Sequence, residues 1–207
     1  TKVIPRESRR ITYSSEIRQL KTVPFTEEQR AIVIGSVLGD GCLHVNWSNT
    51  NYTLKITRSE KQKEYVEWQY QQLQPFVRTV PRWYEPTRSY TMRTVSHKEL
   101  TSLHEEFYEN GKKRLPARIQ EYLQQSLTLA VWFMDDGNIR TSNGVFGGYN
   151  LNTQSFTFEE NQLIAKLLAD LYGIRASVER NHKYHRIGIY DRRSGDILRS
   201  LFDWHII

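Results

Sequence analysis

Apolar residues recur along the chain in helical and strand-like patterns, and the same order of patterns occurs twice. A capping-box sequence over residues 26–29 precedes an apolar helix over 31–38, which is predicted to end at Gly39-Asp40-Gly41. Five further elements follow in the order strand pair, helix, hairpin, helix, helix, over residues 44–57, 61–73, 77–95, 97–108 and 116–123.

The order then repeats. An apolar helix over residues 127–134 ends at Asp135-Asp136-Gly137 and is followed by a strand pair, a helix, a hairpin and a helix over 139–156, 158–172, 176–190 and 195–202. The two Asp-Gly steps lie 96 residues apart in a chain of 207. A duplicated αββαββα unit accounts for this spacing. The sequence therefore predicts an α+β fold with a basic arm and two halves, over residues 1–25, 26–125 and 126–207.

Charge is segregated between the predicted strands and the predicted helices. The chain carries a net charge of +6, of which the first 24 residues supply +4. The four strand segments (residues 44–58, 78–98, 138–158 and 172–193) sum to +11, which leaves −9 for the rest of the body. A positive sheet surface backed by acidic helices suits duplex DNA, because neutralised phosphates supply much of the binding affinity.

The cysteine and histidine content further narrows the class of protein. Cys42 is the one cysteine, which excludes an internal disulfide and fits a reducing intracellular compartment. The six histidines lack the spacing of zinc ligands. The most apolar stretch, residues 31–38, is too short to span a bilayer, so we expect a soluble protein without a membrane partner.

The two Asp-Gly steps are candidates for a metal site. A carboxylate at the carboxyl end of a helix is electrostatically unfavourable, and unpartnered backbone carbonyls point the same way. Together they form an oxygen-rich site that suits a hard divalent cation. If the helices lie side by side, Asp40 and Asp136 converge and can hold two or more ions that activate water and stabilise a leaving oxygen. The alternative is an ordinary turn, which the occurrence at two equivalent helix ends disfavours.

Four stretches carry a resemblance to a known family. Val33-Ile-Gly-Ser-Val-Leu-Gly-Asp-Gly41 and Leu129-Ala-Val-Trp-Phe-Met-Asp-Asp-Gly137 resemble the two motifs of the LAGLIDADG homing endonucleases. The stretch Tyr108-Glu-Asn-Gly-Lys-Lys-Arg-Leu-Pro116 is similar to an intron-encoded subgroup, as is Thr153-Gln-Ser-Phe-Thr-Phe-Glu-Glu160. The resemblance covers residues 26 to about 205.

The resemblance implies a pseudo-twofold monomer with its motif helices at the central interface and its antiparallel sheets forming a DNA-binding saddle. Such a protein hydrolyses both strands of a long double-stranded DNA target across the minor groove and leaves short 3′ overhangs. It uses Mg²⁺, with two or more ions between the motif helices. One departure is Val131, which stands where Gly35 stands in the first motif and where a small residue is usual.

The resemblance also assigns site residues. Asp40 and Asp136 are the implied metal-binding and catalytic carboxylates, and the carbonyls of Gly39 and Asp135 complete the metal shell. By repeat position, four further residues support catalysis, namely Lys55, Asn152, Lys98 and Arg193. The alternative for these four is a phosphate contact or a solvated surface.

Strands lying in the major groove can present alternate side chains to base edges. The candidates for DNA contact are the polar and aromatic residues Asn46, Trp47, Asn49, Asn51, Arg58, Arg82, Tyr84, Arg88, Tyr90, Arg93, Arg140, Asn143, Asn150, Gln154, Ser177, Arg180, His182, Lys183 and His185. The two halves differ in these residues, which predicts an asymmetric target. For any one of them the alternative is a solvated strand face.

Two other functions stay open. An RNA-splicing maturase would use the same fold on intron RNA and would not need Asp40 and Asp136. A non-cleaving DNA-binding protein would not need the acid pair either. The expected location is an organelle or a prokaryotic cytoplasm.

Overall fold

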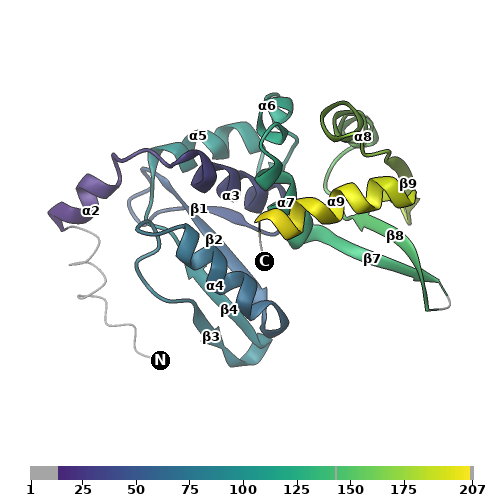
Figure 1. The fold of residues 1–207 in the computed structure, drawn as a ribbon. Coiled ribbons are helices and arrows are strands. Elements are labelled where there is room, and N and C mark those ends of the chain that lie inside the picture. Colours follow the sequence, from purple (N-terminus) through teal and green to yellow (C-terminus); the bar gives the residue numbers. More distant parts are fainter. Residues whose placement is uncertain (1–13, 143, 206–207) are drawn as a thin grey trace. The chain divides into compact units, whose positions relative to one another are not determined.

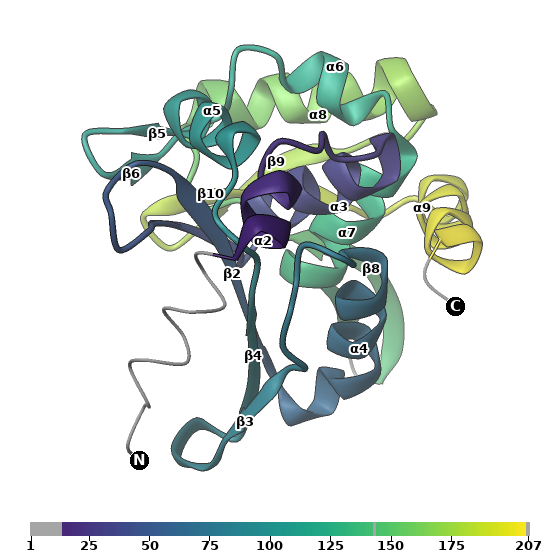
Figure 2. The same cartoon turned by 90° about the vertical axis from the view of Figure 1, so that its left-hand side faces the viewer.

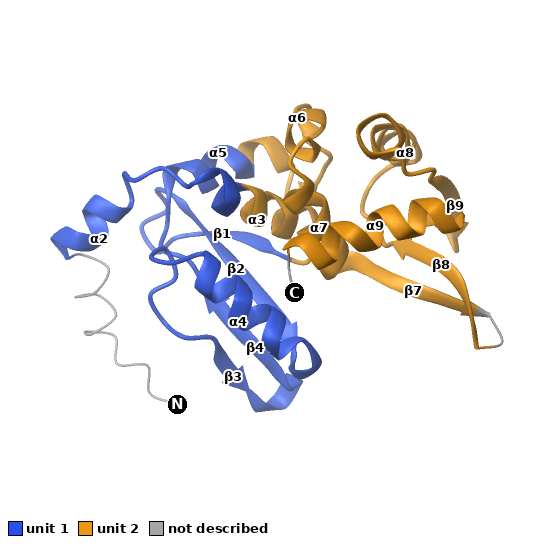
Figure 3. Ribbon diagram, in the orientation of Figure 1, with its two compact units in different colours: residues 1–30, 41–104 blue, residues 31–40, 105–207 orange. Residues whose placement is uncertain are grey.

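The computed structural model describes residues 14–142 and 144–205, which form two compact units (Figure 3). The first unit takes the described residues up to Arg30 together with 41–104. The second takes residues 31–40 and those from Glu105 onward. The boundary falls inside helix α3 (Glu27–Leu38), so most of the first motif helix packs with the second unit.

The first unit contains a four-stranded antiparallel sheet in the order β1-β2-β4-β3 (Figure 1). Its elements are α2 (Ser15–Leu20), the start of α3, β1 (Cys42–Val45), β2 (Tyr52–Ser59), η1 (Glu60–Gln62), α4 (Lys63–Gln72), β3 (Arg82–Tyr84), η2 (Glu85–Thr87), β4 (Ser89–Arg93) and most of α5 (Lys98–Phe107).

Helix α4 runs along one face of this sheet (Figure 2). Alternate residues of β2 and β4 turn apolar side chains to that face, and Leu54, Ile56 and Met92 are buried there. Val66 of α4 is fully buried. The opposite face of the sheet, which we call the first open face, is therefore the one that carries the polar side chains of the strands.

The second unit repeats this arrangement. Its sheet has the order β7-β8-β10-β9, which is the order of the first sheet element for element. The elements of this unit are the rest of α3, β5 (Tyr108–Glu109), β6 (Lys112–Lys113), α6 (Ile119–Leu123), α7 (Ser126–Asp136), β7 (Gly137–Ser142), β8 (Val145–Leu151), α8 (Phe158–Tyr172), β9 (Ser177–Asn181), β10 (Tyr184–Ile189) and α9 (Arg192–His205). The shared strand order confirms the duplicated αββαββα pattern.

Helix α8 shows how local sequence sets the boundaries of an element. Thr157 and Glu160 form a reciprocal capping box at its start, and Gly173 ends it in the left-handed conformation at φ 68°. The helix packs against β9 and β10, where Ile187 and Ile189 are buried. The face of the sheet opposite α8 is the second open face.

Most predicted elements lie within a few residues of their expected positions, and two were missed. Residues 15–20, in the stretch read as an arm, form a helix capped by Ser14; residues 1–13 of that arm lie outside the described residues. The short β5–β6 hairpin was not expected either. Within residues 14–142 and 144–205, no helix is both long and apolar enough to cross a membrane.

Candidate active site

The ends of α3 and α7 lie in close contact within the second unit. A Cβ atom placed on Gly35 would fall 2.7 Å from the Thr128 carbonyl oxygen and 2.7 Å from the Cβ atom of Val131. One turn further on, a Cβ atom on Gly39 would lie 2.8 Å from Oδ2 of Asp135. Gly35 therefore makes the room that Val131 takes up, and the valine does not prevent close packing of the two helices.

This packing brings the two acid-bearing helix ends together. Asp40 follows α3, and Asp136 ends α7. Burial, together with the negative charges of Asp40 and Asp135, raises the pKa of Asp136 to about 7. The side chain of Asp135 itself lies against Gly39. The structure thus separates the two neighbouring carboxylates of the second motif and places Asp136 within electrostatic reach of Asp40.

Lys113 is a residue of this site that sequence reasoning did not single out. Its Nζ donates a hydrogen bond of 2.7 Å to the carbonyl oxygen of Gly39, and its charge opposes the rise in the pKa of Asp136. It lies on β6, just after Asn110 and Gly111, which turn at φ 51° and 74°. Asn-Gly is a strong hairpin signal, so the sequence held a cue to the turn that positions Lys113.

Asn152 also lies beside Asp136. Its backbone N–H donates to the Asp136 carbonyl oxygen at 3.0 Å. Its side-chain amide donates to Oδ1 of Asn138 at 3.2 Å, and Gln154 donates to Oδ1 of Asn152 at 3.4 Å. The structure therefore places a chain of amide side chains beside the backbone of Asp136.

The other expected supporting residues lie elsewhere. Lys55 is in β2, paired with Cys42 and Arg93, and exposed Lys98 begins α5; both belong to the first unit. Arg193 is exposed in the first turn of α9 in the second unit. A catalytic role for these three stays a prediction.

The oxygen donors of the site fit a hard divalent cation. Carboxylates and backbone carbonyls are the ligands that Mg²⁺ prefers, and like-charge repulsion of the kind acting on Asp136 is relieved by a bound cation. Among the described residues, no three His, Cys, Asp or Glu side chains are grouped as metal ligands. A metal held here would therefore take further oxygen ligands from outside this set of side chains.

The first open face carries part of the predicted DNA-contact set. Cross-strand pairing puts Lys55, Arg93 and Arg82 on one face, together with the hydroxyl pair of Thr57 and Thr91 at 3.0 Å. The pKa of His44 on the same face is lowered by burial and by the charges of Arg93 and Lys55. Tyr84 shares this face at 56% exposure.

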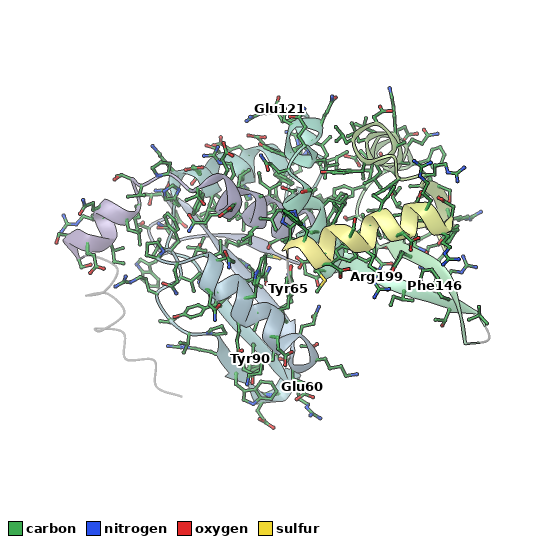
Figure 4. All side chains as sticks on the ribbon, viewed as in Figure 1. Glu60, Tyr65, Tyr90, Glu121, Phe146 and Arg199 are labelled. Carbon is green, nitrogen blue, oxygen red and sulfur yellow. The ribbon has the colours of Figure 1, made fainter. Side chains whose placement is uncertain are left out.

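Arg58 corrects the predicted contact set. It is paired with Tyr90 on the α4 side of the sheet, is only 2% exposed, and its guanidinium lies 5.7 Å from the ring centroid of Tyr65. Figure 4 labels Tyr65 on α4 and Tyr90 on β4. A side chain buried in this way cannot reach a base edge, so Arg58 is a core residue. Tyr90 contacts Trp83 on the same side, with ring centroids 5.0 Å apart.

Several candidates in the first unit shape turns. Oδ1 of Asn46 accepts hydrogen bonds from the backbone of Thr50 and Asn51, and Oδ1 of Asn51 accepts one from Thr101. The β1–β2 turn also holds Asn49, at φ 55°, and the 89%-exposed Trp47. Arg88, at φ 46°, pairs with Glu60 at 2.5 Å.

In the second unit the candidates divide between the two faces of the sheet. Arg140 lies on the second open face, and Ser177 shares it with Gly188. Asn150 is on the same face but only 2% exposed beneath the Tyr190 hydroxyl, so, like Arg58, it cannot reach a base edge and corrects the predicted contact set. Arg180 and His185 are paired on the α8 side, where the His185 ring contacts that of Phe158. His182 and Lys183 form the β9–β10 turn. Asn143 lies outside the described residues.

The second unit also contains a cavity of about 1190 Å³, which is lined by residues of β7, β8 and α9 among others. Its lining includes Phe133, Tyr149 and Phe202, together with Phe146 and Arg199, which are labelled in Figure 4. Asp40 and Asp136 do not line it. The candidate active site is therefore built on the helix ends and not on this cavity.

The repeated fold and the paired acidic helix ends define a class of two-motif α+β proteins, and comparison with known sequences gives the family. The model of the LAGLIDADG DNA endonuclease family matches residues 30–196, so the chain belongs to that family. An uncharacterized protein of Methanocaldococcus jannaschii, MJ1098, is 26% identical over 80% of the chain. Probable intron-encoded endonuclease 1 of Wickerhamomyces canadensis is 28% identical over 74% of the chain and 69% of its own length.

The chain spans only 65% of the length of MJ1098. The cytochrome b mRNA maturase bI2 of Debaryomyces hansenii is 32% identical to it over 47% of this chain, which corresponds to 35% of the maturase. Among solved structures, the homing endonuclease I-WcaI bound to its DNA recognition sequence superimposes with a TM-score of 0.82. That match is 24% identical and covers 94% of this chain and 90% of the other. I-DmoI in complex with DNA and Mn matches with a TM-score of 0.52 at 14% identity, over 86% of this chain and 98% of the other. These likenesses confirm the fold.

Proposed function

We propose that this chain is a site-specific DNA endonuclease that hydrolyses both strands of a long, asymmetric duplex across the minor groove and leaves short 3′ overhangs. Membership of a DNA endonuclease family supports this function. The observation that carries it is the approach of Asp136 to Asp40 at the abutting ends of α3 and α7. Asp40 is exposed and Asp136 is half-buried, and two like charges held this close at packed helix ends destabilise a fold, so their presence needs a chemical reason.

Mg²⁺ is the ion that we propose for this pair. Asp40 and Asp136 would hold it, with the carbonyls of Gly39 and Asp135 as further ligands, and two or more ions would be bound between the motif helices. When bound, such ions polarise the scissile phosphate and lower the pKa of attacking water. The structure of I-DmoI in complex with DNA and Mn supports the use of a divalent ion.

The residues around the pair have separable tasks. Lys113 donates to the Gly39 carbonyl and offsets part of the negative charge at Asp136. Asn152, fixed by its bond to the Asp136 carbonyl, is placed to order water or a phosphate oxygen. Lys55, Lys98 and Arg193 are proposed to stabilise charge on the phosphates. Acting alone as a monomer, one chain supplies both acidic helix ends.

A second candidate function is RNA splicing. The likeness to the cytochrome b mRNA maturase bI2 supports intron RNA as an alternative partner. The two functions differ in what they require of the aspartates, because folding of an RNA on a basic surface does not need a hydrolytic metal. The acid pair therefore favours the endonuclease.

The test is cleavage of a library of long DNA duplexes in Mg²⁺ by the wild-type chain and by Asp136→Asn. We expect the wild type to cut a small subset of sequences and Asp136→Asn to bind that subset but cut it at least about 10³-fold more slowly. The matched control is Asp170→Asn, the same change at an exposed position of α8, which should cut normally.

Binding without cleavage by the wild type would favour a non-cleaving DNA-binding protein. Equal cleavage by the wild type and Asp136→Asn would remove that carboxylate from the mechanism. Rescue of splicing of an intron transcript by Asp136→Asn would support the maturase alternative.

A further inference from the structure

Glu179 is the only acidic residue in the eight strands of the two four-stranded sheets, all of which lie in the described part of the chain. It is on β9, directly opposite Arg186 of β10, and both side chains lie on the second open face. A carboxylate on a surface that meets DNA repels phosphates, so it weakens binding unless it performs a specific task.

The carboxylate of Glu179 interacts with three other side chains. Nε of Arg186 donates a hydrogen bond of 2.5 Å to its Oε1, and Nη1 of Arg140 lies 3.7 Å from its Oε2. The hydroxyl of Tyr190 donates to Oε2 as well. Burial disfavours the charged form, but the hydrogen bonds from Tyr190 and Arg186 outweigh it and lower the pKa of Glu179. The side chains of Glu179 and Arg186 are only 23% and 22% exposed, so this cluster is held rigidly.

Two glycines make space for the tyrosine of this cluster. A Cβ atom on Gly188 would overlap the Tyr190 hydroxyl, and a Cβ atom on Gly148 would fall 2.8 Å from the Tyr190 ring. The ring therefore lies against the backbone of β8 and β10, and the Arg140 guanidinium sits 5.1 Å from its centroid. The hydroxyl also lies 3.1 Å from Oδ1 of Asn150, another predicted DNA-contact residue.

The first open face has no such cluster in its described strands. It presents Lys55, Arg82 and Arg93, and β1 to β4 contain no acidic residue. Basic side chains of this kind suit phosphates, which any sequence offers. On the second open face, by contrast, Arg186 is held in one direction by its hydrogen bond to a carboxylate, and a fixed direction is what recognition of a base edge requires.

We propose that Glu179 is a specificity-determining residue that orients Arg186 to read guanine in the major groove. The inference rests on the proposed site-specific function. Because Glu179 occupies Nε, the terminal nitrogens of the Arg186 guanidinium are left as paired donors, the geometry that matches O6 and N7 of guanine. Repulsion between Glu179 and phosphates disfavours the competing placement of Arg186 on the DNA backbone.

The experiment is selection of bound sequences from a randomised duplex pool without added divalent ion, so that bound DNA stays intact. Four proteins are compared by sequencing: the wild type, Glu179→Gln, Arg186→Lys and Glu121→Gln. The last is the matched control, because it removes an acid of equal charge that pairs with an arginine, Arg118, at helix α6 and not on a strand face. Thermal melting of each variant reports whether the fold is retained.

We expect the wild type to enrich a site with at least one strongly preferred guanine. Both Glu179→Gln and Arg186→Lys should reduce the preference for that guanine by about fivefold or more, the lower end of the value of a bidentate contact. Glu121→Gln should leave every base preference unchanged. Arg186→Lys keeps the charge and tests the same contact from its other side, so the inference does not depend on Glu179→Gln folding.

An unchanged guanine preference in both variants would overturn the inference. A uniform loss of affinity with all base preferences retained would overturn it too, because that result indicates a purely structural ion pair. Enrichment of no sequence by the wild type is a different result, because it removes the site-specific function on which the inference stands.

Discussion

At the scale of single residues, the site depends on two neighbouring acids that have different surroundings. Asp135 packs against Gly39, whereas Asp136 interacts with Asp40. Their order in the sequence does not tell them apart chemically. The rotation of 100° between successive residues of a helix does, because it turns one carboxylate toward α3 and the other toward the helix end.

Lys113 provides a residue-scale prediction. Replacing it with Met removes the 2.7 Å hydrogen bond to the Gly39 carbonyl and the charge beside Asp136, while keeping an unbranched side chain. We expect cleavage to slow by about 10- to 100-fold, the usual cost of removing a partner of a metal-ligating group, with little change in DNA affinity. Single-turnover cleavage and a binding titration measure the two effects separately.

The neighbouring Lys112 supplies the control, because it is an exposed lysine on the same short strand. Lys112→Met should cut at the wild-type rate. Equal rates for both variants would show that Lys113 has no role beyond its position on the hairpin.

At the scale of elements, a buried histidine joins the start of α5 to the segment before α3. His97 is fully buried; its Nε2 faces the Val23 carbonyl at 2.9 Å, and its Nδ1 accepts the Glu99 amide N–H at 3.2 Å. The contact with the Val23 carbonyl needs a proton on Nε2, and the contact with the Glu99 amide needs an unprotonated Nδ1. The geometry therefore requires the neutral ring.

This requirement predicts a loss of folding stability in mild acid. Burial lowers the pKa of His97, aided by Lys98 and opposed by Val23 and Glu99. The unfolded chain then binds a proton more readily, so the stability is present above about pH 6.5 and is lost as the pH falls through the lower folded-state pKa. We expect the free energy of unfolding, measured by urea denaturation, to fall between pH 7.5 and 5.5.

His97→Gln tests the origin of that loss. Glutamine offers one donor and one acceptor and does not titrate, so the variant should be less stable at pH 7.5 but should show a shallower decline toward pH 5.5. His44 and His205, whose pKa values are also lowered, contribute equally in both proteins. Parallel declines would assign the acid sensitivity to groups other than His97.

At the scale of the whole molecule, charge is sorted between strands and helices. The strands of both sheets hold one acid, Glu179, whereas acids are frequent on helices such as α3 and α8. Electrostatic attraction to a polyanion therefore acts through the open faces of the sheets, where it adds to whatever base recognition the strands supply.

Neutralising the first open face should lower DNA affinity without changing its sequence preference. For a variant with Lys55, Arg82 and Arg93 all changed to Gln, we expect the slope of log affinity against log salt to fall by about 0.9 for each lost phosphate contact. Titration of a fluorescent duplex at several salt concentrations measures the slope. A Lys63→Gln, Lys166→Gln variant on helices α4 and α8 is the control and should keep the wild-type slope.

The sequence by itself determined the features that depend on local pattern. Hydrophobic period, capping residues and the two Asp-Gly steps predicted the repeated αββαββα order and the acid pair, because these signals act over a few neighbouring residues. The extent of α8 is an example, since Thr157 and Gly173 fix both of its ends.

Only the tertiary structure decided which side chains meet. Arg58 looks like a DNA contact in sequence but is buried against Tyr65, because the pairing register assigns it to the α4 side of the sheet. Lys113 contacts Gly39, which lies 74 residues earlier in the sequence, and Glu179 pairs with Arg140 of another strand. Such contacts arise from the packing of elements distant in sequence, and neither composition nor period encodes the face or the partner that each residue acquires.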